Sequence, residues 1–163
     1  MWTALLATMV FGAVSIRDGA PKQPEPKILA RGVWPVREDK GERLVLHDAR
    51  ELAIALGAAP KDARERRFQN DAETDAAKLF KVKDINWNKQ MVVVVAVGVR
   101  RTGGYRVEIE SLTVKDEVLT VKWKLHEPRP GDLVTQALTY PTQMALVDRF
   151  QGRVAFDPPA ETK

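Results

Sequence analysis

Few side chains in this sequence have the type and spacing that catalysis requires. Serine occurs only as Ser15 and Ser111, and histidine only as His47 and His126. A serine nucleophile needs an exposed, strained turn and a histidine base within hydrogen-bond reach, but Ser111 lies inside a segment of strand periodicity. Neither histidine has a motif around it, so we expect surface or edge histidines and no enzymatic activity.

Metal and cofactor sites have no support in the sequence either. The chain has no cysteine, which excludes disulfides, a thiol nucleophile and thiolate zinc sites. It also lacks the HExxH, paired-histidine and EF-hand spacings. Glu108 and Glu110 share one side of a predicted strand next to Lys and Arg, which is typical of a solvated face. We therefore expect no metal and no cofactor.

The stretch RRTGGYR, Arg100–Arg106, has the composition of a ligand-binding loop. Two glycines beside three arginines could hold a single anion in a nest of backbone N–H groups. A phosphate loop opens into a helix N-terminus, however, and this stretch opens into a strand-like segment at Tyr105. A tight turn in which Gly103 or Gly104 has a positive φ is the commoner explanation. Tyr105 then either packs its ring on the sheet, as the strand parity favours, or presents it to a partner.

The charge pattern argues against a nucleic-acid partner. The 163 residues carry 26 Lys and Arg against 22 Asp and Glu, a formal net charge of +4. A nucleic-acid footprint needs basic side chains gathered on one face with few acids between them. The densest basic cluster, KDARERR at 61–67, contains acids itself, so we interpret it as a solvated surface.

The first 15 residues, MWTALLATMVFGAVS, predict a signal peptide. They contain no charged side chain, and as a helix they would span about 22 Å, less than a bilayer core of roughly 30 Å. Ala13 and Ser15 place small residues where a signal peptidase cleaves, and a proline-rich spacer follows at 16–27. We expect an exported protein (periplasmic, on the cell surface or secreted) with no stable membrane span after cleavage. The alternative is a buried first element of the domain.

A single domain is expected over residues 28–157, followed by a tail at 158–163. Its first part predicts an extended edge segment, a short strand and two short helices. The edge segment is expected at Ile28–Val36 and the short strand at Arg43–His47. The first helix is expected to begin after Asp48, which acts as N-cap with Glu51 as its capping-box partner, and the second helix is expected at Ala72–Phe80. Gly57 is expected to end the first helix. The polar stretch Ala58–Asn70 lacks an apolar period and is expected to be a surface excursion.

From Ile85 onward the apolar period changes to two, which predicts strands. Met91–Val97 is continuously apolar, as in a central strand buried on both faces. The apolar parity shifts near Glu110–Ser111, where we expect a bulge. Residues 119–125 alternate between apolar and polar, which predicts a half-buried strand with Trp123 in the core.

The end of the domain predicts a closing hairpin. Met144–Phe150 and Arg153–Phe156 are strand-like and flank Gln151-Gly152 as the turn. The predicted fold class is therefore α+β and β-rich: a mostly antiparallel sheet or sandwich-like domain with two short N-terminal helices.

Alternating strand direction predicts that two connections lie at the same end of the sheet. These are the loop containing TGGY and the long segment His126–Gln143, which are the first and third connections among the last strands. A connection of that length is uncommon unless it is functional or disordered, and its prolines favour a rigid binding loop. The candidate partner-binding residues are Arg100, Arg101, Thr102, Gly103, Gly104, Tyr105, Pro128, Arg129, Pro130, Gly131, Gln136, Thr139, Tyr140 and Pro141.

Residues 85–156 resemble the C-terminal domain of the PrcB family. The resemblance rests on INWNKQMVVVVAVGVRRTGGYRVEIESLTV, KLHEPRPGDLVTQALTYPTQMALV and VAF. That family is named for a non-catalytic subunit of a bacterial surface protease complex. The resemblance implies an exported accessory domain, with an unidentified protein, for example an exported protease, as its partner. It assigns no chemistry to these residues.

A second hypothesis uses the same end of the sheet. The TGGY loop also looks like the threonine-glycine-tyrosine loop of chagasin-type cysteine-peptidase inhibitors, although their GxGG and Arg-Pro-Trp motifs are missing here. The alternative to a protein-interaction module is therefore a peptidase-inhibitor-like or small-anion-binding β domain. An inhibitor would block peptidases at stoichiometric concentration, and an accessory subunit would not.

Overall fold

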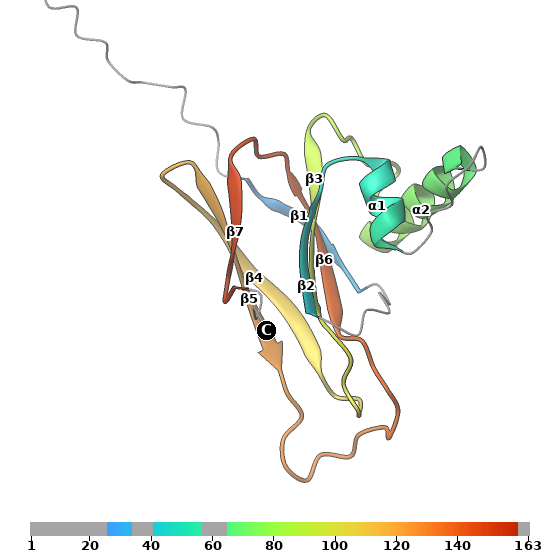
Figure 1. The fold of residues 1–163 in the computed structure, drawn as a ribbon, viewed down its shortest axis with the longest axis vertical. Helices are drawn as coiled ribbons and strands as arrows, with labels where there is room; N and C mark the ends of the chain where they lie inside the picture. Colours follow the sequence, from blue (N-terminus) through green and yellow to red (C-terminus); the bar gives the residue numbers. More distant parts are fainter. Residues whose placement is uncertain (1–25, 34–40, 57–64, 160–163) are drawn as a thin grey trace, which may run out of the picture.

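The computed structural model describes residues 26–33, 41–56 and 65–159, apart from the side chains of residues 65–71 (Figure 1). The predicted signal peptide, residues 16–25 of the predicted spacer, Trp34–Val36, the helix stop at Gly57 and the last four residues lie outside the described part.

The described residues form seven strands and two helices. In chain order they are β1 (Ile28–Gly32), β2 (Gly41–Leu46), α1 (Ala49–Ala55), α2 (Glu65–Phe80), β3 (Gln90–Val97), β4 (Arg106–Lys115), β5 (Val118–His126), β6 (Thr142–Asp148) and β7 (Arg153–Asp157). Strands β1, β6, β3 and β2, in that order, form a four-stranded antiparallel sheet. Strands β4, β5 and β7 form a three-stranded sheet. The predicted β-rich α+β class is confirmed.

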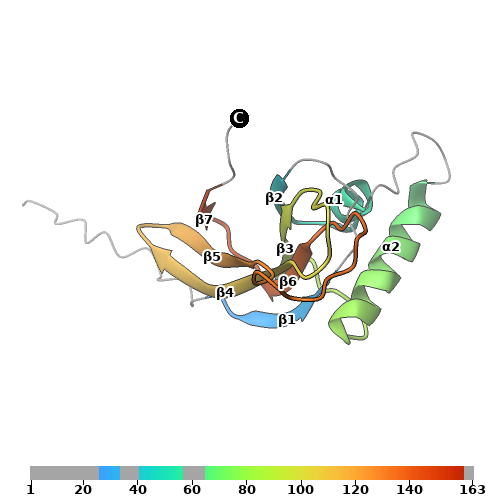
Figure 2. The same ribbon diagram turned by 90° about the horizontal axis from the view of Figure 1, so that it is seen from below.

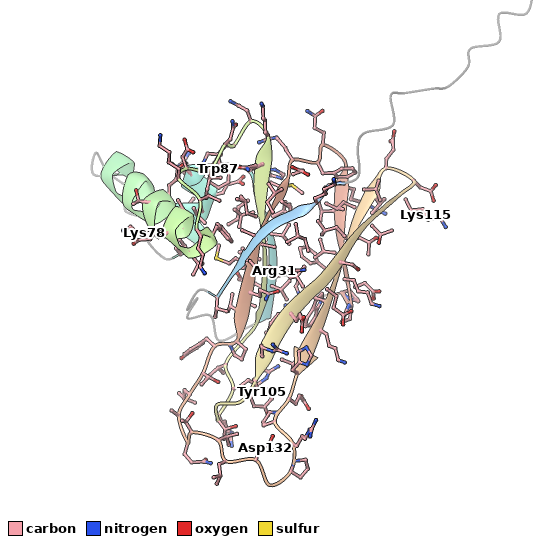
Figure 3. The ribbon with its side chains drawn as sticks, turned by 180° about the vertical axis from the view of Figure 1, so that it is seen from behind. Arg31, Lys78, Trp87, Tyr105, Lys115 and Asp132 are labelled. Atoms are coloured by element: carbon pink, nitrogen blue, oxygen red, sulfur yellow. The ribbon has the colours of Figure 1, made fainter. Side chains whose placement is uncertain are left out.

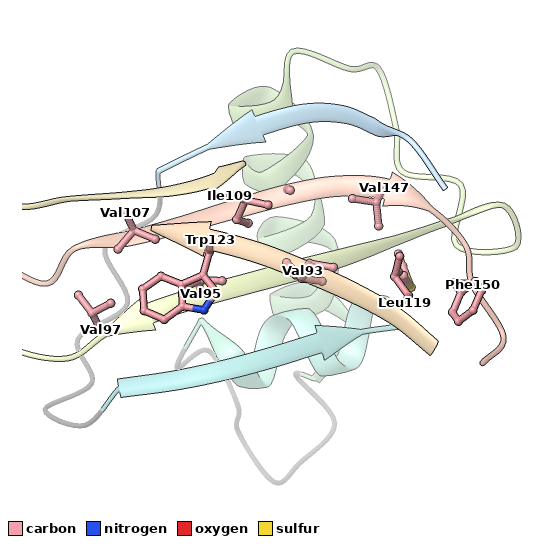
Figure 4. Packing of buried hydrophobic residues seen from close by; sticks show 12 residues of the cluster. Val93, Val95, Val97, Val107, Ile109, Leu119, Trp123, Val147 and Phe150 are labelled. Atoms are coloured by element: carbon pink, nitrogen blue, oxygen red, sulfur yellow. The ribbon is translucent and has the colours of Figure 1, made fainter. Parts of the chain in front are cut away.

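The two sheets and the helices form three layers, with the four-stranded sheet in the middle (Figure 2). Strand β3 lies inside that sheet, and its odd and even residues face different layers. Val93 and Val95 pack with Ile109 and Val121 of the three-stranded sheet (Figure 4), whereas Val92 packs with the residues under the helices. The prediction of a central strand buried on both faces is confirmed.

The helices are needed because the outer face of the four-stranded sheet is apolar. Val92, Val94 and Leu146 lie on that face together with Leu52 of α1 and Phe80 of α2. Full burial of an aliphatic side chain contributes about 1.5–3 kcal/mol relative to exposure. Without the helical cover, this face would be a large exposed apolar patch.

Helix α1 begins as the sequence predicts, at an aspartate N-cap. The Asp48 carboxylate accepts a hydrogen bond from the backbone N–H of Glu51 at 2.7 Å. The Glu51 carboxylate in turn accepts from the N–H of His47 at 2.6 Å. In the usual capping box the backbone N–H of the N-cap residue donates this second bond. Here the donor is the residue before the N-cap, His47.

The predicted start of the second helix was wrong. Helix α2 begins at Glu65, seven residues before the predicted start at Ala72, so the second part of the predicted surface excursion Ala58–Asn70 is helical; residues 58–64 lie outside the described part. The sequence does not indicate this part of the helix because Glu65–Asn70 contains only one apolar residue, Phe68, and so has no helical apolar period.

The predicted closing hairpin was also wrong. Strand β7 does not pair with β6 but runs parallel to β5, with Leu119 opposite Val154. The connection between β6 and β7 crosses from one sheet to the other, and the buried ring of Phe150 lies in the core between them. Gly152 passes so close to the Glu117 carbonyl and the Phe150 ring that a side chain would collide. The glycine marks a close backbone crossing, not a two-residue hairpin turn.

The predicted bulge is present, and it joins the two sheets. The register of β4 against β5 shifts between Ile109 and Ser111. At that point the Ile109 N–H donates to the side-chain oxygen of Gln143 on β6, and its carbonyl accepts from the Nε of Arg31 on β1 at 3.2 Å (Figure 3). Side chains of the four-stranded sheet therefore satisfy the backbone at the bulge.

We predict that Gln143→Leu lowers the free energy of unfolding by about 1–3 kcal/mol, because it leaves the part-buried Ile109 N–H without an acceptor. Gln90→Leu is the matched control: the Gln90 side chain accepts from the exposed N–H of Asn86 at 2.8 Å, where water can replace it, so the cost should stay within about 0.5 kcal/mol. Urea unfolding followed by tryptophan fluorescence measures both. Equal losses in the two variants would contradict the bulge interaction.

Candidate partner-binding loops

Two loops bridge the sheets at one end of the molecule. The TGGY loop (residues 98–105) leads from β3 to β4, and the proline loop (residues 127–141) leads from β5 to β6, so each connects the two sheets. Figure 1 shows both at the end opposite the β4–β5 turn. Arg100 and Thr139 form an antiparallel bridge between them. The prediction that these loops are neighbours is confirmed.

Backbone hydrogen bonds fix the position of one loop against the other. The Arg100 N–H donates to the Thr139 carbonyl at 2.8 Å, and the Thr139 N–H returns a bond to the Arg100 carbonyl at 2.9 Å. The Gly103 N–H donates to the Thr135 carbonyl at 2.8 Å. The Thr139 hydroxyl donates to the Thr102 carbonyl, also at 2.8 Å. The two loops therefore form one structural unit.

Each glycine of the TGGY loop is required at its position for a different physical reason. Gly103 is buried, and a Cβ on it would collide with the side chain of Thr135. Gly104 has φ +85°, and a Cβ on it would lie 2.8 Å from the Val134 side chain and 2.9 Å from that of Pro128. The predicted positive φ is therefore at Gly104, while Gly103 permits a close approach of the loops.

The proline loop contains a turn of its own. The Asp132 N–H donates to the Arg129 carbonyl at 3.0 Å, and the Asp132 carboxylate accepts from the Arg129 N–H at 2.8 Å. Pro130 and Gly131 lie between them, and Gly131 has φ +93°. Proline and a positive-φ glycine are the residues that such a turn requires.

The predicted site residues divide into an exposed set and a supporting set. Gly103 and Pro141 are buried, and Thr102, Tyr105, Pro128, Thr139 and Tyr140 are half-buried. The Arg100 guanidinium lies 5.7 Å from the centre of the Tyr105 ring, a cation–π distance. The residues exposed to solvent are Arg101, Gly104, Arg129, Pro130, Gly131 and Gln136. The structure therefore brings the predicted residues together, but about half of them hold the loops rather than face outward.

Comparison with known proteins covers this same region. Residues 91–148 match the family model described as PrcB C-terminal. This part of the chain is similar to the PrcB C-terminal family. The match runs from the start of β3 to the end of β6 and so contains both loops. No curated protein and no solved structure matches the chain.

Sequence reasoning missed some exposed residues of the PrcB C-terminal segment. Leu133 and Leu138 are exposed at 104% and 63% relative accessibility, but apolar residues in a loop were not treated as surface candidates. Val134 and Thr135 were missed because their role is to meet the glycines of the other loop. An isolated apolar residue inside a proline–glycine loop is the signal that could have identified Leu133.

The candidate catalytic residues Ser111 and His126 do not lie close together. Ser111 is exposed on β4 opposite Lys122, four residues along β5 from His126, a separation of about 13 Å at strand spacing. The His126 ring lies 2.8 Å from the Glu108 carboxylate, which also lies 3.5 Å from Arg106. These groups form a surface cluster at the base of the proline loop.

Anion, metal and membrane sites were also considered. Gly103 and Arg100 direct their N–H groups into the other loop, so these donors are unavailable for an anion nest. Among the described residues, no three His, Asp or Glu side chains are grouped closely enough to hold a metal ion. Within the same residues, no helix has the length and apolarity needed to cross a membrane.

We predict that Gly104→Ala lowers the free energy of unfolding by about 2–4 kcal/mol, the sum of backbone strain at positive φ and overpacking against the proline loop. Gly131→Ala is the matched control, because Gly131 also has a positive φ but no atom lies within 4 Å of its Cβ position. It should cost only the strain, about 1–2 kcal/mol. Urea unfolding gives both values, and equal costs would show that the Gly104 contact is unimportant.

Proposed function

We propose that this protein is an exported, non-catalytic interaction module whose TGGY and proline loops together contact a protein partner. The observation that carries the proposal is the set of hydrogen bonds between the loops, from Arg100–Thr139 to Gly103–Thr135. Loops that are already ordered lose little conformational entropy on binding. Rigid loops on a β scaffold are frequent recognition surfaces.

The exposed chemistry of the loops suits a protein partner. Arg101 and Arg129 are exposed beside Pro130 and Gln136, and arginine is enriched at protein interfaces. Nearby acids, Glu127 and Asp132, keep the formal charge of the two loops at only +1, from three arginines and two acids. A mixed surface of this kind favours a partner with both charge signs over a nucleic acid.

The non-catalytic part of the proposal rests on the separation of candidate groups. Ser111 lies on β4 opposite Lys122, which is about 13 Å from His126 along β5. The ring of His126 is engaged with Glu108. The resemblance to the PrcB family implies an accessory role, and we propose an exported protease as the partner class.

Export predicts a defined mature chain. When the full sequence is expressed in a bacterium with its own N-terminus, the exported fraction should contain a species beginning at Ile16, identified by intact mass. Ala13→Arg, which places a large charge at the third residue before the cleavage site, should block processing. An uncleaved chain confined to the cytosol in both cases would refute export.

A site-specific photo-crosslink tests the binding surface. A photoreactive residue at Arg101 or at Gln136 should give the same discrete adduct with an exported protein of the source organism. Lys78 is the matched control position, with a side chain 72% exposed on α2, away from the loops (Figure 3). That position should not give the adduct. An identical adduct from all three positions, or from none in folded protein, would rule out a loop-borne interface.

A further inference from the structure

Strand β4 has a free edge beyond its bulge. The strand pairs only with β5 and lies at one side of the three-stranded sheet. At the bulge, the side chains of Arg31 and Gln143 cover this edge by bonding the carbonyl and the N–H of Ile109. From Ser111 to Lys115 the strand continues into the β4–β5 hairpin, whose end projects from the body of the molecule at Lys115 (Figure 3). An uncovered edge of this kind is a template for another strand.

The ladder between β4 and β5 determines which backbone groups of this edge are free. Because the N–H and the carbonyl of Ile109 point away from β5, those of Trp123 opposite it point away from β4. The extra residue of the bulge is on β4, so β5 keeps this alternation without a break, and its partners two and four residues before Trp123 face Leu112 and Val114. Leu112 and Val114 therefore direct their N–H and carbonyl groups to the free edge. Within the described part of the chain, no hydrogen bond is formed to these groups.

The free edge matches a second copy of itself. When two such edges run antiparallel about a two-fold axis at Thr113, the two threonines lie opposite each other, and Leu112 lies opposite Val114 of the second copy. Each Leu112–Val114 pair then exchanges both of its backbone hydrogen bonds. Leu112 and Val114 are half-buried and pack against the core. The pairing therefore sets an apolar side chain against an apolar side chain on the core face of the sheet.

The charges along the edge favour the same register. Glu110 is the extra residue of the bulge, and its carboxylate lies 3.7 Å from the ammonium group of Lys122. Ser111 lies opposite Lys122, so Glu110 and Ser111 meet the same solvent face of the sheet. In the two-fold register, Lys115 of the second copy lies opposite Ser111 and next to Glu110. Each copy thus brings a cation to a carboxylate of the other.

We propose that β4 pairs with β4 of a second copy over Ser111–Lys115, which joins two three-stranded sheets into one sheet of six strands. The contact is isologous: each copy uses its free edge once, so the assembly closes as a dimer and does not grow into a filament. An extended segment of another protein is the other candidate for this edge. Such a segment supplies the backbone bonds, whereas a second copy also supplies the apolar pairs and the lysine beside Glu110.

The dimer leaves the candidate partner-binding loops free. The β4–β5 turn lies at the end of the molecule opposite the TGGY and proline loops (Figure 1). Because the two copies run antiparallel, their loop ends lie on opposite sides of the shared contact. The dimer therefore carries the loop surface twice, and two linked sites bind an array of partner molecules more tightly than one site does. The pairing itself does not depend on the proposed function.

Sedimentation velocity of the purified full-length chain tests the proposal. The strand contact is smaller than a standard interface, so the dimer fraction should rise between about 10 μM and about 1 mM. Thr113→Lys and Thr113→Glu each place like charges opposite each other at the two-fold axis, and each should weaken self-association at least about tenfold. An equimolar mixture of the two variants should recover the wild-type dimer fraction, because opposite charges then meet.

Thr120→Lys is the matched control. Thr120 lies opposite Thr113 on β5, but inside the sheet, between β4 and β7. This variant adds the same charge away from the edge, so its association constant should stay within about twofold of the wild-type value. Circular dichroism checks that each variant is folded.

Three outcomes overturn the proposal. They are a wild type that stays monomeric over this range, a dimer that survives both Thr113 variants, and folded variants whose mixture does not associate. A photoreactive residue at Thr113 that crosslinks to another protein and not to a second copy would assign the edge to that protein instead. Crosslinks from Arg101 and Gln136 in the Thr113→Lys variant report the loop interface separately, so the two proposals fail independently.

Discussion

Burial of β3 on both faces is the constraint on which the rest of the structure depends. An antiparallel sheet normally leaves one face in water, but Met91–Val97 is apolar at every position. One face is therefore covered by the three-stranded sheet and the other by α1 and α2. The chain must consequently cross between layers several times.

The crossings at the loop end create the candidate site. The β3–β4 and β5–β6 connections each leave one sheet and enter the other, so they run side by side over the end of the core. Their proximity permits the Arg100–Thr139 bridge and the fit of Thr135 against Gly103. The same packing that stabilises the core thus holds an exposed segment around Leu133 in a defined shape.

The sequence predicted some features of the fold correctly and others wrongly. The double burial of Met91–Val97 and the N-cap at Asp48 are local signals, and both are confirmed. Helix α2 was predicted too short because the sequence of its first turns has no apolar period. The β6–β7 hairpin failed for a different reason: Gln151-Gly152 has turn composition, but its glycine serves a close crossing over Glu117. Local composition does not distinguish a turn from a crossover.

The sequence by itself determined the β-rich class, the central strand, the bulge near Glu110–Ser111 and the shared end of the two loops. Periodicity and strand parity are properties of consecutive residues, and they need no knowledge of distant contacts. Only the tertiary structure decided the parallel pairing of β7 with β5, the separate reasons for Gly103 and Gly104, and the exposure of Leu133. Each of these depends on a neighbour many residues away in the chain, and a single sequence does not state which distant residues meet.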